Sequence, residues 1–310
     1  MKSIIIPVYK NEENIPSLLK ALTLIKKSLN DKVEFVFIVD GSPDKSYAIL
    51  NETLPTSGLD AQLLLLSKNF GSFSAIRMGL EHATGEYFGV MAADLQEPPE
   101  LIIESMRILE TNEYDVIVGT RESRSDPLLS KLSSKLFWYL YKKFIVSDMP
   151  VGGVDIFSCN KVFRDELLFL EENHSSLIAQ IFWLGFRRKI IYYTRLKREH
   201  GTSGWTLRKK IDYMMDSIFS FTDLPVKLLT RLGIVGMLFF FLFGTSAFIA
   251  RLMGWIEVPG YTTTFLSVGF FGAMNMFGLG IVGSYTWRTY ENTKHRQLSI
   301  CMKKSEFKTI

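Results

Sequence analysis

This chain has few of the residues that build disulfide frameworks or zinc sites. Its 310 residues include two cysteines, Cys159 and Cys301, and four histidines. The cysteines are far apart and form no CxxC pair or Cys/His cluster, which argues against both kinds of site and is typical of a reducing compartment. The net charge of +4 is small, and its basic excess lies near apolar segments, which favours anionic lipid over nucleic acid as a partner.

Three sequence motifs are also missing. No GxGxxG follows the first strand-like segment and no GxxxxGK[ST] occurs, which disfavours a dinucleotide oxidoreductase and a P-loop NTPase. Residues 180–183 read QIFW, without the arginine of the QxxRW motif that a processive polysaccharide synthase would need. No signal peptide precedes Pro7, so we expect roughly the first 200 residues to stay in the cytoplasm.

Charged side chains are absent from two long segments, residues 232–250 and residues 261–287. At a helical rise of 1.5 Å per residue they span about 28 and about 40 Å, enough to cross a hydrocarbon core of about 30 Å. The alternative is a pair of buried helices in a soluble core, but such helices rarely stay uncharged for so long. We therefore predict two membrane spans joined by a short loop.

The basic residues that flank the two segments predict the orientation of the spans. They are Lys227 and Arg231 before the first segment and Arg288, Lys294 and Arg296 after the second. By the positive-inside rule both ends of the hairpin face the cytoplasm. This predicts a multi-pass protein of the plasma (inner) membrane whose amino-terminal domain is cytoplasmic.

The amino-terminal two thirds of the chain alternate between strand and helix patterns. Apolar strand-like runs cover residues 3–8, 33–39, 63–66, 87–91 and 116–119. Helical patterns follow Asn14, Ser42-Pro43-Asp44, Ser72 and Pro98, where polar caps or prolines suit a first turn. Such alternation predicts an α/β domain with a mainly parallel, Rossmann-like sheet and helices on both faces.

Two amphipathic stretches follow the α/β pattern. The helix expected after Asp126-Pro127 carries leucines opposite lysines, and an ordinary surface helix and a membrane-facing helix are both compatible with it. Residues 206–221 lie just before the first span and are expected at the membrane interface. We expect a catalytic domain at 1–205, an interfacial helix at 206–228, a transmembrane hairpin at 229–290 and a basic cytoplasmic tail at 291–310.

The segment MAADLQEPP, residues 91–99, places Asp94 and Gln96 at the end of an apolar strand and before a helix that begins with proline. Ligands of open α/β sheets bind outside the carboxyl ends of the strands. Oxygen ligands two residues apart can share Mg²⁺ or Mn²⁺ with a diphosphate. The alternative is that Asp94 only caps the following helix.

Five motifs in order resemble glycosyltransferase family 2, and within it the polyprenyl-phosphate glycosyltransferases, the group of dolichol-phosphate mannose synthase and the bactoprenol glucosyltransferases. They are IPVYKNEE at 6–13, FIVDGS at 37–42, KNFG at 68–71, GLEHATG at 79–85 and ADLQEP at 93–98. The resemblance covers almost the whole chain, including the two spans. It implies a GT-A fold that binds a nucleotide sugar at the carboxyl edge of the sheet.

The resemblance also implies roles for particular residues. The donor-binding residues it implies are Pro7, Tyr9, Glu12, Asp40, Asn69, Arg198, Ser203 and Trp205. Asp94 and Gln96 match the metal-binding catalytic loop, and Arg121 and Arg124 match basic residues that face the lipid phosphate. Residues 198–205 resemble a lid over the donor diphosphate, with a plain linker as the alternative; for Tyr9 and Glu12 the alternative is loop packing.

The reaction that the resemblance implies is the inverting transfer of a hexose to undecaprenyl phosphate, with UDP-glucose as the expected donor and Mg²⁺ or Mn²⁺ as cofactor. GDP-mannose, UDP-GlcNAc and a homo-oligomeric state are left open. Ala92 stands where the family usually has an acid, and Gly152-Gly153-Val154-Asp155 replaces the family's Gly-Asp segment. These departures keep a second interpretation open, a degenerate, non-catalytic transferase that anchors or recruits partners.

Overall fold

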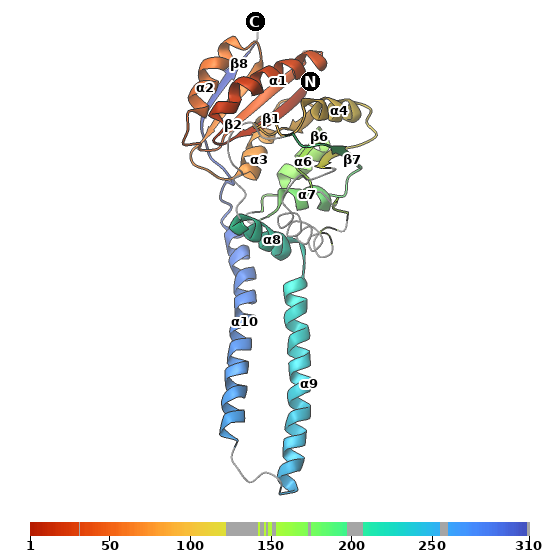
Figure 1. The fold of residues 1–310 in the computed structure, drawn as a ribbon, viewed down its shortest axis with the longest axis vertical. Coiled ribbons are helices and arrows are strands. Elements are labelled where there is room, and N and C mark those ends of the chain that lie inside the picture. Colours follow the sequence, from red (N-terminus) through yellow and green to blue (C-terminus); the bar gives the residue numbers. More distant parts are fainter. Residues whose placement is uncertain are drawn as a thin grey trace. The chain divides into compact units, whose positions relative to one another are not determined.

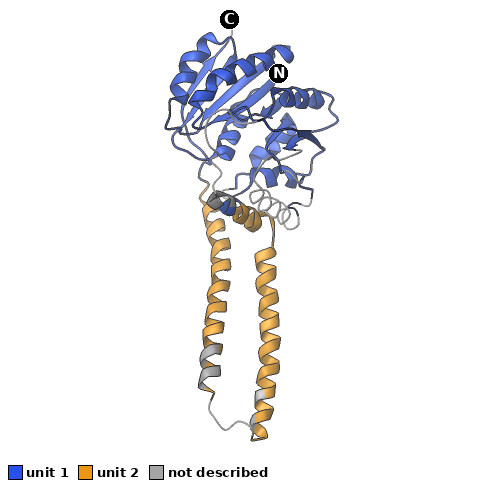
Figure 2. Ribbon diagram, in the orientation of Figure 1, with its two compact units in different colours: residues 1–213, 296–310 blue, residues 214–295 orange. Residues whose placement is uncertain are grey.

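The chain divides into two compact units, residues 1–213 together with 296–310 and residues 214–295 (Figure 2). The computed structural model describes residues 1–30, 32–121, 142, 146, 148–150, 153–172, 175–196, 207–254 and 260–308. The first unit contains an eight-stranded sheet. The second contains two long helices and part of the helix that precedes them.

The sheet has the strand order β7-β5-β6-β4-β1-β2-β3-β8. Its strands are β1 (Lys2–Val8), β2 (Val33–Val39), β3 (Asp60–Leu66), β4 (Tyr87–Val90), β5 (Val116–Arg121), β6 (Ile156–Asn160), β7 (Arg188–Tyr193) and β8 (Cys301–Phe307). The β1–β2, β1–β4, β2–β3 and β5–β7 pairs are parallel. The β3–β8, β4–β6 and β5–β6 pairs are antiparallel. The five predicted strands are confirmed as β1 to β5 within a few residues.

Helices cover both faces of this sheet (Figure 1). One core packs α1 (Ile15–Ser28), α2 (Ser46–Thr53) and α4 (Pro99–Glu110) on strand residues such as Ile4 and Ile6. The other packs α3 (Ser72–His82), α6 (Lys161–Phe169) and α7 (Leu177–Trp183) on residues such as Ile5. Neighbouring strand residues point to opposite faces, so apolar runs such as β1 supply both cores.

The second helix begins later than predicted. It was expected to open at Ser42-Pro43-Asp44, but α2 begins at Ser46, and the turn η1 (Glu12–Asn14) lies before α1. The Asp44 carboxylate accepts hydrogen bonds from the loop that follows β1 as well as from Ser46. This tertiary contact holds residues 42–45 in a loop.

Three strands were not predicted. β6 and β7 are short and interrupted by polar residues, so they lack a long apolar run. β8 lies within the predicted basic tail, 291–310, and pairs with β3. Its sequence, CMKKSEF, is mostly exposed, as charged edge strands are.

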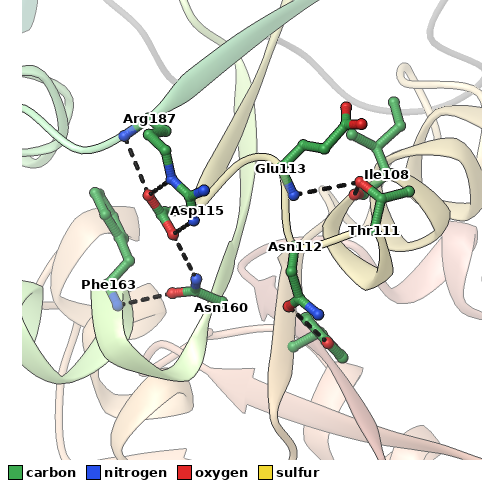
Figure 3. A network of polar contacts seen from close by, with 9 residues as sticks. Ile108, Thr111, Asn112, Glu113, Asp115, Asn160, Phe163 and Arg187 are labelled. Atoms are coloured by element: carbon green, nitrogen blue, oxygen red, sulfur yellow. Dashed lines mark hydrogen bonds and ion pairs between the residues drawn. The ribbon is translucent and has the colours of Figure 1, made fainter.

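A polar network connects β6 and β7 to β5 (Figure 3). Asp115, just before β5, accepts hydrogen bonds from the backbone N, Nε and Nη2 of Arg187 at 2.8–3.2 Å. It also accepts one from Nδ2 of Asn160 at 2.9 Å. Hydrogen bonds from Arg187 hold the pKa of Asp115 below its usual range, aided by Asn160. The network anchors the end of β6 and the start of β7 beside β5.

Three helices follow the α/β region: α8 (Leu207–Phe221), α9 (Leu224–Leu252) and α10 (Tyr261–Thr293). In α9 and α10, Leu224–Ala250 and Ser267–Thr293 are each long and apolar enough to cross a membrane, by length and composition. Within the second unit, Arg288 forms an ion pair of 2.8 Å with Asp216 of α8. The predicted helix after Asp126 lies outside the described residues.

Candidate active site

The loops after β1 and β2 interlock at the carboxyl edge of the sheet. Backbone N–H groups of Lys10 and Glu12 donate to Ser42 Oγ and Asp44 Oδ2 at 2.8 and 3.1 Å. In return, Lys45 N donates to Glu12 Oε2 at 2.8 Å. Glu12, predicted to contact the donor, therefore links the two loops.

Asp44 is the central acceptor of this pair of loops, and the sequence analysis missed its role. It accepts from Ser42 Oγ at 2.6 Å, from Ser46 N and Oγ at 3.1 and 2.8 Å, and from Glu12 N. Partial burial alone would raise its pKa, but these hydrogen bonds outweigh burial and lower the pKa. A charged Asp44 thus holds the loop that follows β1 and carries Tyr9. Pro7 is the penultimate residue of β1, and the Tyr9 side chain is 41% exposed at the sheet edge.

Asp40 holds the loop after β3. Its two carboxylate oxygens accept from Phe70 N at 2.7 Å and Gly71 N at 2.9 Å, and Asn69 Nδ2 donates to its carbonyl oxygen at 3.3 Å. Burial raises the pKa of Asp40, and the two backbone hydrogen bonds oppose that effect. The predicted donor-binding residues Asp40 and Asn69 therefore meet, and Asp40 also organises the loop.

Gly41 lets these loops approach closely. It has a φ of +54°, and a Cβ at this position would lie 2.2 Å from the backbone carbon of Lys68. Only glycine fits such an approach without displacing backbone. The positions of Asp40 and Asn69 thus depend on this residue.

Asp94 and Gln96 lie in the loop between β4 and α4, as predicted. Asp94 Oδ1 accepts from Gln96 N at 3.4 Å, across Leu95 with a φ of +53°. Pro98 is the residue that caps α4, so the alternative in which Asp94 caps this helix is wrong. The chain makes a turn at Leu95, so the carboxyl group of Asp94 and the amide group of Gln96 lie in one short segment.

Glu97, the next residue, is buried and was not predicted as a site residue. Its side chain is 4% exposed, and its Oε2 atom has no hydrogen-bond partner among the described residues. Burial, with the nearby charges of Asp94 and Asp155, raises the pKa of Glu97 to about 7, while Arg195 opposes the rise. The loop that carries Asp94 and Gln96, called the metal loop below for its predicted role, therefore adjoins a carboxyl group that is protonated in part of the molecules at neutral pH.

Arg121, at the end of β5, forms an ion pair with Asp155, which lies one residue before β6. The Nη2–Oδ1 and Nε–Oδ2 distances are 2.7 and 2.6 Å, and Tyr193 of β7 donates its hydroxyl to Asp155 at 2.7 Å. Burial and the Asp155 charge raise the pKa of Tyr193, so the hydroxyl stays protonated. The departure at residues 152–155 was the available sequence signal for Asp155; for Tyr193 there was none.

Arg195 is a second guanidinium at this edge that the sequence analysis missed. Its Nη2 donates to Gln96 Oε1 at 2.5 Å. The predicted residues Arg124, Arg198, Ser203 and Trp205 lie outside the described residues.

The residues of the β4 loop fit a divalent cation as a partial ligand set. A carboxylate and an amide oxygen are ligands that Mg²⁺ and Mn²⁺ accept. Among the residues that the structure describes, no three or more His, Cys, Asp or Glu side chains form a group that could hold a metal ion. Further ligands would have to come from a diphosphate and water, which is usual for Mg²⁺.

Two curated relatives match this chain over most of their own length. Putative glycosyltransferase CsbB of Bacillus subtilis (strain 168) is 32% identical over 294 residues, which cover 95% of this chain and 89% of that protein. A prophage bactoprenol glucosyl transferase homolog of Escherichia coli (strain K12) is 28% identical, with coverage of 95% and 96%. A solved structure of the mannosyltransferase PcManGT from Pyrobaculum calidifontis, in complex with GDP-Man and Mn²⁺, matches with 14% identity and a TM-score of 0.46, covering 92% of this chain and 87% of that one.

Sequence comparison shows the family to which this chain belongs. The model of glycosyl transferase family 2 matches residues 3–169, a range that holds β1 to β5, the interlocked loops and the Asp94 loop. The resemblance seen in the five motifs is therefore confirmed. With its GT-A, Rossmann-like sheet, this chain belongs to glycosyltransferase family 2.

Proposed function

We propose that this protein is a membrane-bound, inverting glycosyltransferase that moves a hexose from a nucleoside diphosphate sugar, UDP-glucose, to undecaprenyl or another polyprenyl phosphate at the cytoplasmic face. One observation carries the proposal. At a single sheet edge the Asp94–Gln96 loop meets the guanidinium of Arg195, with Arg121 at the end of β5. The two apolar helices support a lipid acceptor, and relatives named bactoprenol glucosyl transferases support the choice of sugar and lipid.

The charges at this edge suit a reaction between two phosphates. A divalent cation held by Asp94 and Gln96 would stabilise the negative charge that develops on the leaving diphosphate. Arg121 donates a hydrogen bond from Nη2 to Asp155, and its Nε lies at ion-pair distance from the same carboxylate; a guanidinium has five N–H donors, so it can hold a phosphate at the same time. Asp155 and Tyr193 would keep the plane of Arg121 oriented for that contact.

The acceptor needs little help from a general base. A phosphate monoester has a second pKa near 6 and is mostly a dianion at neutral pH. One of its oxygens can therefore attack the anomeric carbon directly while the bond to the diphosphate breaks. The role left to the protein is to orient the two anions and reduce their repulsion.

Two other functions have particular support. Ala92 leaves the β4 loop with one acid fewer than the family pattern, which keeps open a degenerate transferase that anchors or recruits partners. The loops that follow β1, β2 and β3, which are predicted to face the nucleoside, are held to one another by hydrogen bonds from backbone N–H groups. These hydrogen bonds do not discriminate between UDP-glucose, UDP-GlcNAc and GDP-mannose as the donor.

The direct test is transfer to lipid. Membranes that contain the protein are incubated with undecaprenyl phosphate and a panel of labelled nucleotide sugars, and lipid-linked product is measured. We expect product from UDP-glucose, and about 100-fold less or none from matched membranes with the Asp94→Asn variant. No lipid-linked product from any donor would reject the enzymatic function and favour the recruiting one.

A further inference from the structure

Two consecutive residues after β7, Arg195 and Leu196, both contact Gln96 of the metal loop. Arg195 and Gln96 are 99 positions apart in the sequence. Arg195 Nη2 donates to the side-chain oxygen of Gln96 at 2.5 Å. Leu196 N donates to the main-chain oxygen of Gln96 at 2.8 Å. One residue of the metal loop is thus gripped at both its side chain and its backbone.

The chemistry of the Arg195 contact fixes the orientation of the Gln96 amide. A guanidinium has donors only, so the amide atom that faces it must be the oxygen. An amide oxygen has two lone pairs, so a contact with a guanidinium does not by itself prevent it from binding a cation. A charged donor therefore keeps the Gln96 side chain in the one orientation that presents oxygen.

The surroundings of Arg195 favour a fixed position for its charge. Its Nε atom is buried and has no hydrogen-bond partner among the described residues, and its charge acts on the buried Glu97 in opposition to the charges of Asp94 and Asp155. A cation in this place offsets the repulsion among the acids. It also lies just before the segment predicted to close over the donor.

From these contacts we infer that Arg195 is a positioning residue, which orients Gln96 for the divalent cation and holds the metal loop to the end of β7. The inference rests on the proposed function only for the identity of the bound group. Partners that orient metal ligands typically change metal affinity by about 10–100-fold when removed. We therefore expect a similar loss on removing Arg195.

The test compares two arginines that border the same strand. Arg195→Met removes the contact with Gln96, while Arg187→Met, at the start of β7, removes the pair with Asp115. Each full-length variant is studied in detergent by thermal unfolding and by hydrogen exchange of the peptide covering residues 94–97, without metal or nucleotide. Calorimetry then gives the Kd of Mn²⁺ with UDP present.

Arg195→Met should speed exchange at residues 94–97 and raise the Kd of Mn²⁺ at least about tenfold, with partial recovery in Arg195→Lys. Arg187→Met should lower the unfolding temperature and change both other measurements much less than Arg195→Met does. In a Gln96→Met background, Arg195→Met should add little to the Kd, because the two residues act through one contact.

Unchanged exchange and unchanged Mn²⁺ affinity in folded Arg195→Met would overturn the inference. Equal losses in the Gln96→Met background would also overturn it. A wild-type protein that binds no Mn²⁺ with any nucleotide would reject the proposed function instead. In that case the exchange measurement alone still decides whether Arg195 holds the loop.

Discussion

If the β4 loop holds a cation, as proposed above, single residues in it decide how strongly the protein binds that cation by itself. Asp94 supplies a carboxylate and Gln96 an amide oxygen, while Ala92 supplies neither. The free protein should therefore bind Mn²⁺ weakly. Metal and nucleotide should then bind with positive coupling, each raising the affinity of the other by the same factor.

Substitutions at Asp94 and Ala92 test this prediction about the binding of the cation. Asp94→Asn should reduce turnover severely, by about 100-fold or more, because it removes the charge that faces the cation. Ala92→Asp should tighten Mn²⁺ binding without nucleotide. Transfer of labelled sugar to lipid measures the first effect, and calorimetry of Mn²⁺ with and without UDP measures the second; equal affinities in the wild type, or full activity in chelator, would contradict a metal role for Asp94.

Glu97 makes stability depend on pH in a direction opposite to that of most carboxylates. Its pKa in the folded protein is about 7, above the ordinary value of 4.5. The folded state therefore binds more protons than the unfolded state between these values, and stability falls as pH rises from about 4.5 to about 7. Above pH 7 the loss is complete.

The variant Glu97→Gln should not lose stability in this way as the pH rises. Between pH 5 and pH 8, in chelator, its free energy of unfolding should improve relative to the wild type by about 3 kcal/mol, on the scale of 1.36 kcal/mol per pKa unit. Unfolding in detergent at several pH values measures this. Glu104→Gln, at an exposed position of α4, controls for the loss of a carboxylate. Parallel pH profiles for wild type and Glu97→Gln would contradict the prediction.

At the scale of elements, α3 packs on the sheet through a glycine that leaves no room for a side chain. Gly79 is buried in this helix, and a Cβ there would lie 2.5 Å from both Ile38 Cδ1 and Ile5 Cγ2. Alanine normally favours a helix over glycine by about 1 kcal/mol. Here the overlap should outweigh that gain, because well-packed cores resist added methyl groups.

We expect Gly79→Ala to lower the free energy of unfolding by about 1–3 kcal/mol. Ile38→Val removes the Cδ1 atom that the new methyl group would meet, so the double variant should be more stable than the sum of the two single effects. Denaturant unfolding of the three variants tests this. A stabilising Gly79→Ala, or strictly additive effects, would show that the helix shifts freely.

At the scale of the whole molecule, the last strand constrains the membrane topology. β8 pairs with β3 in the sheet that also contains β1, so the chain begins and ends in the same unit. In the sequence, the helices α9 and α10 lie between the two segments that form this unit. If they span a membrane, they must do so as a hairpin, which agrees with the positive-inside prediction.

Reporter fusions can test this topology. A fusion at Pro259, between the helices, should report the periplasm, and a fusion at the carboxyl terminus should report the cytoplasm. A fusion at Asp223, before α9, should match the carboxyl terminus. Periplasmic signal from either of the last two positions would show that the charge-based orientation is wrong.

The sequence by itself determined the elements whose signal is local. Apolar β-branched runs identified β1 to β5, because strands buried on both faces need apolar residues at every position. Pro98 and Pro99 marked the start of α4, and the lack of charge in 232–250 and 261–287 indicated two long apolar helices. The residues Asp94, Gln96, Asp40 and Asn69 were found at the sheet edge because carboxyl ends of parallel strands meet there.

Only the tertiary structure decided what those residues touch. β6 enters the sheet antiparallel between β4 and β5 and brings Asp155 to Arg121, 34 positions away. β7 lies beside β5 and delivers Arg195 to Gln96. These strands are short and partly polar, so their place depends on pairing with distant segments and on the Asp115 network. Such contacts leave no local pattern in the sequence.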